Sequence, residues 1–155
     1  MSDTQRRGRK IMMTPGELDG FLTTQRTCRV ATVSADGAPH VSALWFAWDG
    51  TSLWLYSVVR SKRWADLRRD PRIAVVVDTG EEYEQLRGAE LSGVAEFVGE
   101  IPRTGELCAE LDGPENLFAR KNFGIEDVPY DGRHAWIRLT PLKVVSWDFR
   151  KLGLG

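Results

Sequence analysis

A dense group of basic residues marks the segment of this chain best suited to bind a ligand. The segment RSKRWADLRRDPR, residues 60–72, holds six of the 21 lysines and arginines. Ser61 is a good N-cap residue for a helix that starts at Lys62. Lys62 and Arg63 then lie in the first turn, where the helix dipole already amounts to about half a positive charge. With Arg60 beside them, the hydroxyl, the free backbone amides and the cations predict an anion site suited to a phosphate.

The plainer alternative is that these side chains cover a solvent-exposed helix face or pair with Asp66 and Asp70. We favour this alternative for the later arginines, which are Arg68, Arg69 and Arg72. For Ser61 and Arg63 the residues alone leave both interpretations open.

No other motif predicts catalysis by side chains. The sequence has no nucleophile elbow and no H-E-x-x-H pattern, so we expect neither a catalytic triad nor a metal site. His40 and His134 lie in or beside strand-like runs, where a hydrogen-bonded structural histidine is the favoured interpretation. Cys28 and Cys108 match no metal or redox spacing.

Composition limits the classes of protein that need to be considered. A chain of 155 residues with 42% apolar residues suits one domain with a substantial core. The formal net charge of -1 argues against a general nucleic-acid-binding or membrane-surface protein, because such proteins usually carry a wide basic excess. No apolar run approaches the roughly 18 residues of a membrane span. With two unpaired cysteines expected, a reduced, cytoplasmic setting fits best, and we expect residues 1–10 to be a flexible basic tail before a domain of residues 11–155.

The elements around the basic segment favour a small barrel. Capping residues predict a helix over 14–25, three strand-like runs with Asp-Gly turns follow over 28–58, and the helix capped by Ser61 should end near Asp70, before Pro71. Strands are predicted over 72–78 and 86–100, joined by a solvated loop over 78–88. Residues 102–123 suggest two short helices broken at Gly113-Pro114, and residues 134–149 return to strand with a kink or an edge at Pro141. Many short strands interrupted by isolated helices favour a closed or partly closed β-barrel.

The order of these motifs resembles a known family. The pattern ATV..DG.PHV...WF.WDG..LW, then S.[RK]...L.RDPR...VVD, LRG.EL.G.AE and SWDFRKLGLG, is similar to that of the flavin and deazaflavin oxidoreductases of the pyridoxamine 5'-phosphate oxidase-like superfamily. The blocks RDPR, LRG...G.AE and SWDFRKLG look most like the branch that uses coenzyme F420, a deazaflavin. The resemblance implies a mainly β fold, the FMN-binding split barrel of Greek-key type, and a homodimer with the cofactor in a groove between subunits.

The resemblance also implies a set of cofactor-binding residues. Arg63 corresponds to the basic residue that holds the cofactor phosphate, with Arg60, Ser61 and Lys62 adjacent. Two strand segments face the ring, and residues near the C-terminus approach the site in some family members. These further candidates are Val41, Ser42, Ala43, Leu44 and Trp45, then Tyr56, Ser57 and Val58, and finally Trp147, Arg150 and Lys151. Of the six tryptophans, Trp45 and Trp147 are those for which we weigh ring contact against packing.

Three functions stay open at this point. The first is an F420-dependent oxidoreductase that transfers a hydride to a small conjugated or otherwise electrophilic substrate. The second is the same barrel using FMN, since both cofactors offer a phosphate and a tricyclic ring. The third is a protein that binds a flavin, haem or apolar ligand without turnover, and a nucleic-acid module is a distant fourth.

Overall fold

The computed structural model describes residues 5–6 and 8–153, so part of the expected tail over 1–10 lies outside the described residues. The helices are η1 (Arg9–Ile11), α1 (Pro15–Thr24), α2 (Lys62–Arg69), η2 (Tyr83–Gln85), α3 (Ala109–Phe123) and η3 (Phe149–Leu152). The strands are β1 (Thr27–Val33), β2 (Pro39–Trp48), β3 (Leu53–Val58), β4 (Arg72–Thr79), β5 (Arg87–Val98), β6 (His134–Leu139) and β7 (Lys143–Asp148).

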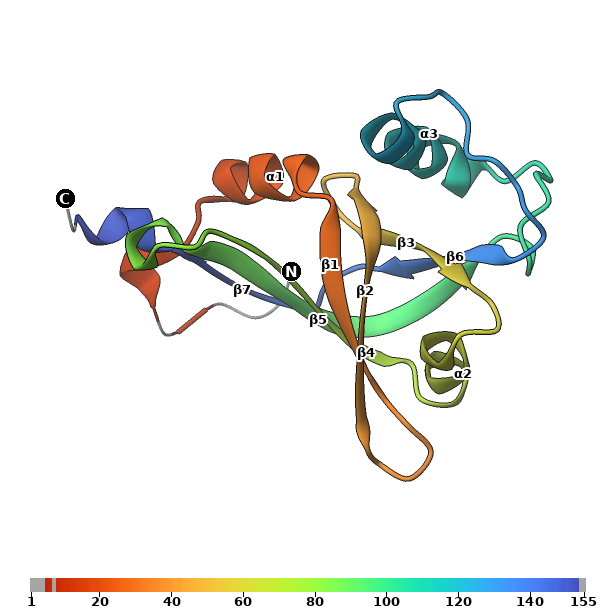
Figure 1. Ribbon diagram of the computed structural model, residues 1–155, viewed down its shortest axis with the longest axis horizontal. Helices are drawn as coiled ribbons and strands as arrows, with labels where there is room; N and C mark the ends of the chain where they lie inside the picture. The colour runs from red at the N-terminus through yellow and green to blue at the C-terminus, as the bar shows by residue number, and fades with distance from the viewer. Residues whose placement is uncertain (1–4, 7, 154–155) are drawn as a thin grey trace.

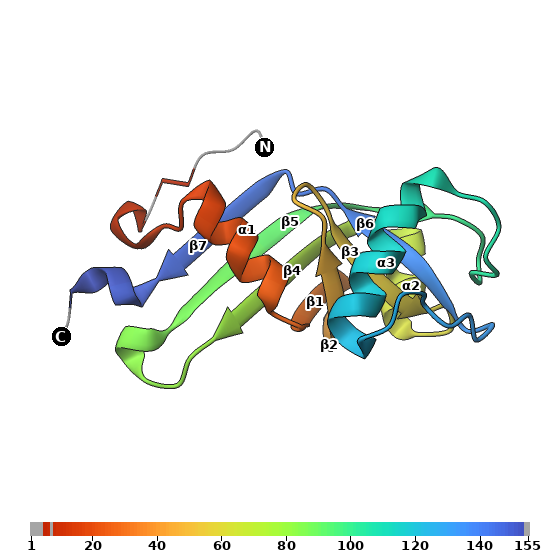
Figure 2. The same cartoon turned by 90° about the horizontal axis from the view of Figure 1, so that it is seen from above.

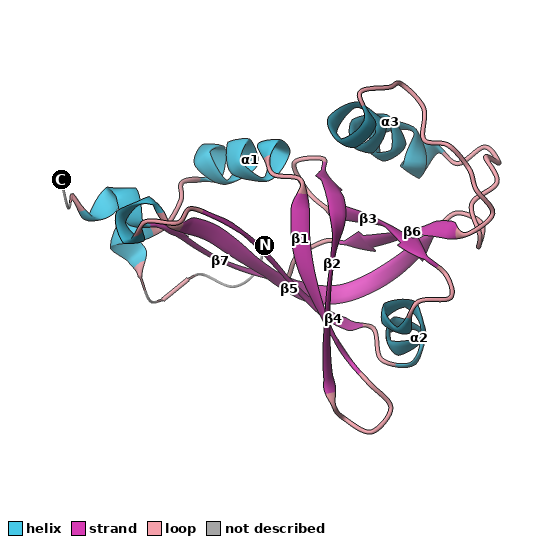
Figure 3. Cartoon of the chain, in the orientation of Figure 1, coloured by secondary structure: helices cyan, strands magenta, loops and turns pink. Residues whose placement is uncertain are grey.

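Six antiparallel strands close into a barrel, as the sequence predicted. The order is β1-β2-β3-β6-β5-β4, and the pairing of β4 with β1 closes the ring, while β7 adds to the first half of β5. The helices lie outside the strands, with α1 and α3 above the barrel in the view of Figures 1 and 3 and α2 below it. Seen from above, α1 lies over β4 and β5, and α3 lies over the opposite end of the molecule, near β3 and β6 (Figure 2).

Local signals explain where the helices begin and end. Thr14 and Glu17 form a capping box at the start of α1, and Ser61 accepts a hydrogen bond from the Trp64 amide at the start of α2. α2 ends at Arg69, and its C-cap Asp70 directly precedes Pro71. Trp64 and Leu67 face the core, as their spacing predicted.

The core has two layers. Inward-facing side chains such as Val30, Phe46, Leu55, Leu91 and Ile137 fill the barrel. A second cluster packs α3 against the outer face of β3 and β6, and its members include Leu111, Phe118, Trp54, Trp136 and the half-buried Tyr56. Strand alternation therefore buries both faces of β3, one inside the barrel and one under α3.

The prediction of two short helices over 102–123 is wrong. Residues 102–108 form a loop, and α3 runs without a break through Gly113 and Pro114. Pro114 lies at the sixth position of the helix, so its missing N–H removes only one hydrogen bond, to the Glu110 carbonyl. Burial of Leu111, Phe118 and Ala119 against the barrel stabilises the helix beyond what local propensity would allow. The break predicted at Pro141 is present, because β6 ends at Leu139 and β7 begins at Lys143.

We expect Gly88→Ala to destabilise the fold by about 1–3 kcal/mol, because overpacking forces neighbouring atoms apart. A Cβ at Gly88 would lie 2.5 Å from a ring atom of Trp147 and 2.7 Å from the Val77 carbonyl oxygen. Chemical denaturation measures the change. Gly113→Ala is the matched control: its Cβ would meet nothing within 4 Å, and alanine in the helix should add about 0.5–1 kcal/mol of stability. Equal stability of the two variants would contradict the assigned contact.

Candidate functional site

The barrel splits where β2 changes partner. Residues 39–45 of β2 pair with β1, and only residues 46–48 pair with β3. On the other side, residues 56–58 of β3 pair with β6 and not with β2. The unpaired edges of two neighbouring strands therefore face each other across a split, and the two predicted strand segments, residues 41–45 and 56–58, are its borders.

Side chains alternate across this split. Ser42 and Leu44 share the inward face of β2 with Val30 and Cys28 of β1, because directly paired residues point to the same side. The outward-facing residues of β2 are Val41, which is 67% exposed, Ala43, and Trp45, which is 39% exposed. On β3, Ser57 points inward and is fully buried, whereas Tyr56 and Val58 point outward and are half-buried.

Arg63 bridges the split from the first turn of α2. Its Nη1 donates to Ser42 Oγ on β2 at 2.7 Å, and its Nε and Nη2 donate to Ser57 Oγ on β3 at 3.1 and 2.9 Å. The guanidinium is buried, and among the described residues no carboxylate forms an ion pair with it. Burial lowers the pKa of Arg63, although it stays protonated at neutral pH. A buried cation held only by neutral hydroxyls is costly, and a bound anion would offset that cost.

The rest of the basic segment lies on the surface. Lys62 is exposed and lies 3.9 Å from the Asp66 carboxylate, and Arg60 is exposed. Of these four residues, the structure brings Arg63 into contact with both strands of the split, whereas Ser61 caps α2 and Arg60 and Lys62 are exposed.

The later arginines are exposed or paired with Asp66 and Asp70, as the sequence analysis favoured. Arg69 lies 3.8 Å from Asp66, and Arg72 pairs with Asp70 at 2.6 Å. Arg68 is exposed on the same helix. Asp66 in turn accepts hydrogen bonds from Thr32 at the end of β1 and from Ser34 just after it, so it ties α2 to the barrel.

The C-terminal candidates do not meet Arg63 within one chain. They lie on β7 and η3, at the opposite end of the molecule from α2 (Figure 1). Arg150 pairs with Asp148 at 2.7 Å, and Lys151 pairs with Glu17 at 2.6 Å. Trp147 is half-buried and covers Gly88. These residues reach a site at the split only if a second chain supplies them.

The two histidines differ. His134 is structural, as predicted: its Nδ1 lies 2.6 Å from an oxygen of Asp131, and its ring stacks on Tyr56 with centroids 4.8 Å apart. For His40 the expectation of a hydrogen-bonded ring is not met, because its buried Nδ1 has no partner among the described residues. His40 lies on the inward face of β2, two residues before Ser42.

Sequence reasoning missed what α3 and α1 contribute beside the split. Lys121 donates to the Gln25 carbonyl at 2.7 Å and lies over the Phe46 ring at 3.9 Å, and burial lowers its pKa to about 8. Phe123 contacts the Trp45 ring edge-on at 5.7 Å, and the Arg26 guanidinium covers that ring at 4.8 Å. No local signal points to these residues, because α3 follows β2 by more than sixty residues in the chain.

Cys28 lies beneath this region, and we expect its thiol to resist alkylation in the folded protein. It is fully buried, and burial raises its pKa to about 12, so little thiolate forms. Cys108 is half-buried and should react roughly a hundredfold faster or more, since it needs no global unfolding. Timed alkylation followed by peptide mass spectrometry measures both rates. Equal rates under native conditions would contradict the packing of β1 described above.

Comparisons with known proteins add a family and a fold. The family model described as Pyridoxamine 5'-phosphate oxidase matches residues 14–148. None of the curated proteins is similar enough in sequence to count as a match.

Solved structures similar to the chain include the following three. The conserved hypothetical protein Rv2991 from Mycobacterium tuberculosis is 31% identical with a TM-score of 0.79, covering 99% of this chain and 94% of that one. An F420 reductase is 23% identical with a TM-score of 0.60, and the match covers 82% of this chain and 94% of the reductase chain. A FAD-binding protein from Mesorhizobium loti is 21% identical with a TM-score of 0.64, and the match covers 87% of this chain and 94% of that protein's chain. The last two establish a shared fold.

The described helices include none with the length and apolar character needed to cross a lipid bilayer.

Proposed function

The chain belongs to the pyridoxamine 5'-phosphate oxidase family, and from this premise we propose that it is an F420-dependent oxidoreductase acting on a small electrophilic or conjugated organic substrate. The observation that carries the proposal is the buried Arg63 guanidinium, which spans the split between β2 and β3 without a carboxylate partner among the described residues. The protein offers this charge at a helix start, where a phosphate also gains from backbone amides.

The residues at the split fit the two ends of such a cofactor. Arg63 and the first turn of α2 suit the phosphate, in line with the prediction from sequence. The unpaired edges of residues 41–45 and 56–58 offer backbone donors and acceptors that would suit the polar edge of a planar heteroaromatic ring. Val41, Ala43 and Trp45 present an apolar surface beside those edges that would exclude water.

The cofactor would supply the hydride, and this chain's residues would bind, orient and shield the reacting groups. The groups at the split suit binding and shielding: they are the buried Arg63 guanidinium, two unpaired strand edges and the rings of Trp45 and Tyr56. His134 and Tyr56 border the outer end of β3, but their partners Asp131 and the Pro129 carbonyl already engage them.

FMN is the second candidate cofactor, because it too carries a phosphate and a tricyclic ring and the split offers the same contacts to it. The preference for F420 rests on the motifs RDPR, LRG...G.AE and SWDFRKLG, and on the additional anionic glutamyl tail of F420, which the exposed Arg60 and Lys62 would favour. We propose no nucleic-acid or membrane partner, and a cytoplasmic location.

A tryptophan-quenching titration of the purified protein with F420 and with FMN, at low and high salt, tests the proposal. Tight F420 binding that weakens with salt, together with weak FMN binding, is the expected result. The reverse preference would move the protein to the flavin enzymes. Binding without hydride transfer to any member of a panel of enones, quinones and nitro compounds would favour the non-catalytic binder.

We further propose that a homodimer completes the site. Exposed apolar side chains lie on β2, at the end of α3 and just after it, namely Val41, Trp45, Phe123 and Ile125, and the Trp45 and Phe123 rings are in contact. A second chain covering them would bury this surface and would bring the C-terminal candidates Trp147, Arg150 and Lys151 toward the split.

We expect Val41→Glu to convert the dimer to a monomer and to weaken F420 binding at least tenfold, because a charge at the centre of an apolar interface is left desolvated. Light scattering and the quenching titration measure the two effects. Leu107→Glu, at a fully exposed loop position, is the control and should change neither. A monomeric wild type that binds F420 at full strength would contradict the dimer.

A further inference from the structure

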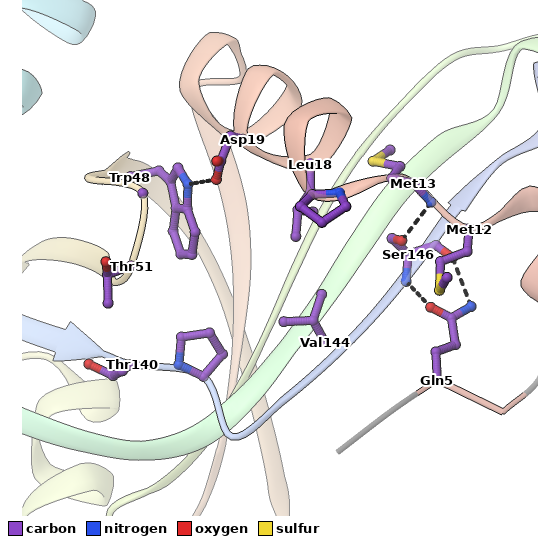
Figure 4. A pocket seen from close by; sticks show the side chains of 13 residues that line it. Gln5, Met12, Met13, Leu18, Asp19, Trp48, Thr51, Thr140, Val144 and Ser146 are labelled. Atoms are coloured by element: carbon purple, nitrogen blue, oxygen red, sulfur yellow. Dashed lines mark hydrogen bonds between the residues drawn. The ribbon is translucent and has the colours of Figure 1, made fainter. Parts of the chain in front are cut away.

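A second cavity lies away from the split, on the side of the barrel covered by α1. It has a volume of about 470 Å³ and lies between α1, the turn joining β2 to β3 and the connection from β6 to β7 (Figure 4). Its lining includes neither Arg63 nor any residue of the two strand segments at the split. The volume is in the range of pockets that bind small organic molecules.

The walls of this cavity are mostly apolar. The apolar lining residues are Met12, Met13, Pro15, Leu18, Trp48, Pro141 and Val144. The wall formed by the N-terminal segment is fastened to β7, since Gln5 and the backbone of Ser146 exchange two hydrogen bonds at 3.0 and 2.9 Å. The Met13 amide also donates to Ser146 Oγ at 3.0 Å (Figure 4). Hydrogen bonds between residues far apart in sequence therefore fix this wall of the cavity.

One charged group lines the cavity. Asp19, an exposed residue on α1, accepts a hydrogen bond from Trp48 Nε1 at 3.0 Å through one carboxylate oxygen (Figure 4). None of the ion pairs among the described residues includes Asp19, whereas Glu17 in the same helix is neutralised by Lys151. The cavity therefore combines a carboxylate without a cationic partner, the indole of Trp48 and an apolar interior.

We propose that this cavity binds a compact organic amine in its ammonium form, with a hydrocarbon or aryl body. The ammonium would donate to the Asp19 carboxylate and lie near the Trp48 ring, which attracts cations. The body would occupy the space between the two methionines and Val144, whose side chains adapt to or pack against apolar groups. An anionic ligand is disfavoured because it would face Asp19, and this separates the ligand class from that of the split.

Phenylbutylamine and phenylbutanol test the proposal, because they share an aryl body of the same size and differ in the charge of the end group. Calorimetry should show one amine bound per chain, about tenfold more tightly than the alcohol, as expected for a charge-assisted hydrogen bond. The indole N–H signal of Trp48 in ¹H–¹⁵N spectra should shift with the same titration curve.

Two variants separate this site from general binding. Asp19→Asn keeps the size of the side chain and an acceptor for Trp48, so the fold should persist while the preference for the amine is lost. Asp112→Asn, an exposed carboxylate on α3 outside the cavity, should leave amine binding unchanged. Arg63→Ala should also leave it unchanged, which makes the outcome independent of the proposed cofactor.

Equal affinities for amine and alcohol, or an unchanged preference in Asp19→Asn, would overturn the assignment of an ammonium ligand. Absence of binding by either compound at millimolar concentration would overturn the site itself. A shift in other indole signals but not in that of Trp48 would also count against it.

Discussion

Replacing Arg63 with alanine should weaken F420 binding by about 1–3 kcal/mol while leaving the fold intact. The guanidinium is the only buried cation that bridges β2 and β3 among the described residues, and its partners there are the hydroxyls of Ser42 and Ser57. Its removal deletes the charge that a phosphate would meet. It also deletes an uncompensated buried charge, so the free energy of unfolding should change little or rise.

The titration of Arg63→Ala needs two companions. Arg63→Lys keeps the charge but lacks the planar guanidinium whose three nitrogens bond Ser42 and Ser57, and it should fall between wild type and alanine. Arg68→Ala, an exposed arginine on the same helix, should bind F420 as the wild type does. Unchanged affinity in folded Arg63→Ala, at low salt, would remove the phosphate site from the split. If Arg68→Ala lost as much affinity as Arg63→Ala, the cause would be the total positive charge of the helix and not a specific contact of Arg63.

Replacing Glu115 with alanine should cost about 3–5 kcal/mol of stability, the loss expected when one partner of a buried ion pair is removed. The Glu115 carboxylate accepts from Arg103 at 2.8 and 3.1 Å, from Trp136 Nε1 at 2.8 Å and from the Tyr130 hydroxyl at 3.0 Å. The Arg103 side chain is only 3% exposed, and its bonds to Glu115 raise its pKa, so it stays charged and would keep Glu100 as its one remaining ionic partner among the described residues. The network joins α3 to the loop before it and to β6.

Thermal unfolding measures this loss, and for a chain of this size a decrease in Tm of about 10 °C is expected. Glu126→Ala is the matched control, because Glu126 pairs with Arg120 in an exposed ion pair worth less than about 1 kcal/mol. Glu115→Gln should lie between them, since the amide oxygen can accept two of the four hydrogen bonds but the amide nitrogen presents N–H groups to the other two donors. If Glu115→Ala unfolds at the temperature of Glu126→Ala, the network does not carry the stability assigned to it.

Local sequence was sufficient for most of the elements. Capping residues determined the starts of α1 and α2, Pro71 determined the end of α2, and Asp-Gly pairs determined the turns of the first three strands. These signals act over a few residues, so they can be read without tertiary structure. The motif order was also sufficient for the family, which the matched model over residues 14–148 establishes.

Local sequence failed where distant burial outweighed it. Gly113-Pro114 predicts a helix break, yet α3 continues because Leu111 and Phe118 pack on the outer face of the barrel. Likewise the local sequence does not say which of Arg60, Lys62 and Arg63 is buried, although the family resemblance singles out Arg63. Only the approach of α2 to the split buries Arg63 and leaves the other two in water, since neighbouring residues of a helix point about 100° apart.

The site itself was therefore determined in part by sequence and in part by topology. The motifs were sufficient to propose Arg63 as a phosphate-binding cation and residues 41–45 and 56–58 as the strand segments beside it. The place where β2 leaves β3, the serines that hold Arg63 and the cavity beside Asp19 arise from contacts between residues 6 to more than 100 positions apart. Such contacts depend on strand register and on helix packing, whose energies are shared over the whole barrel and leave no local mark in the sequence.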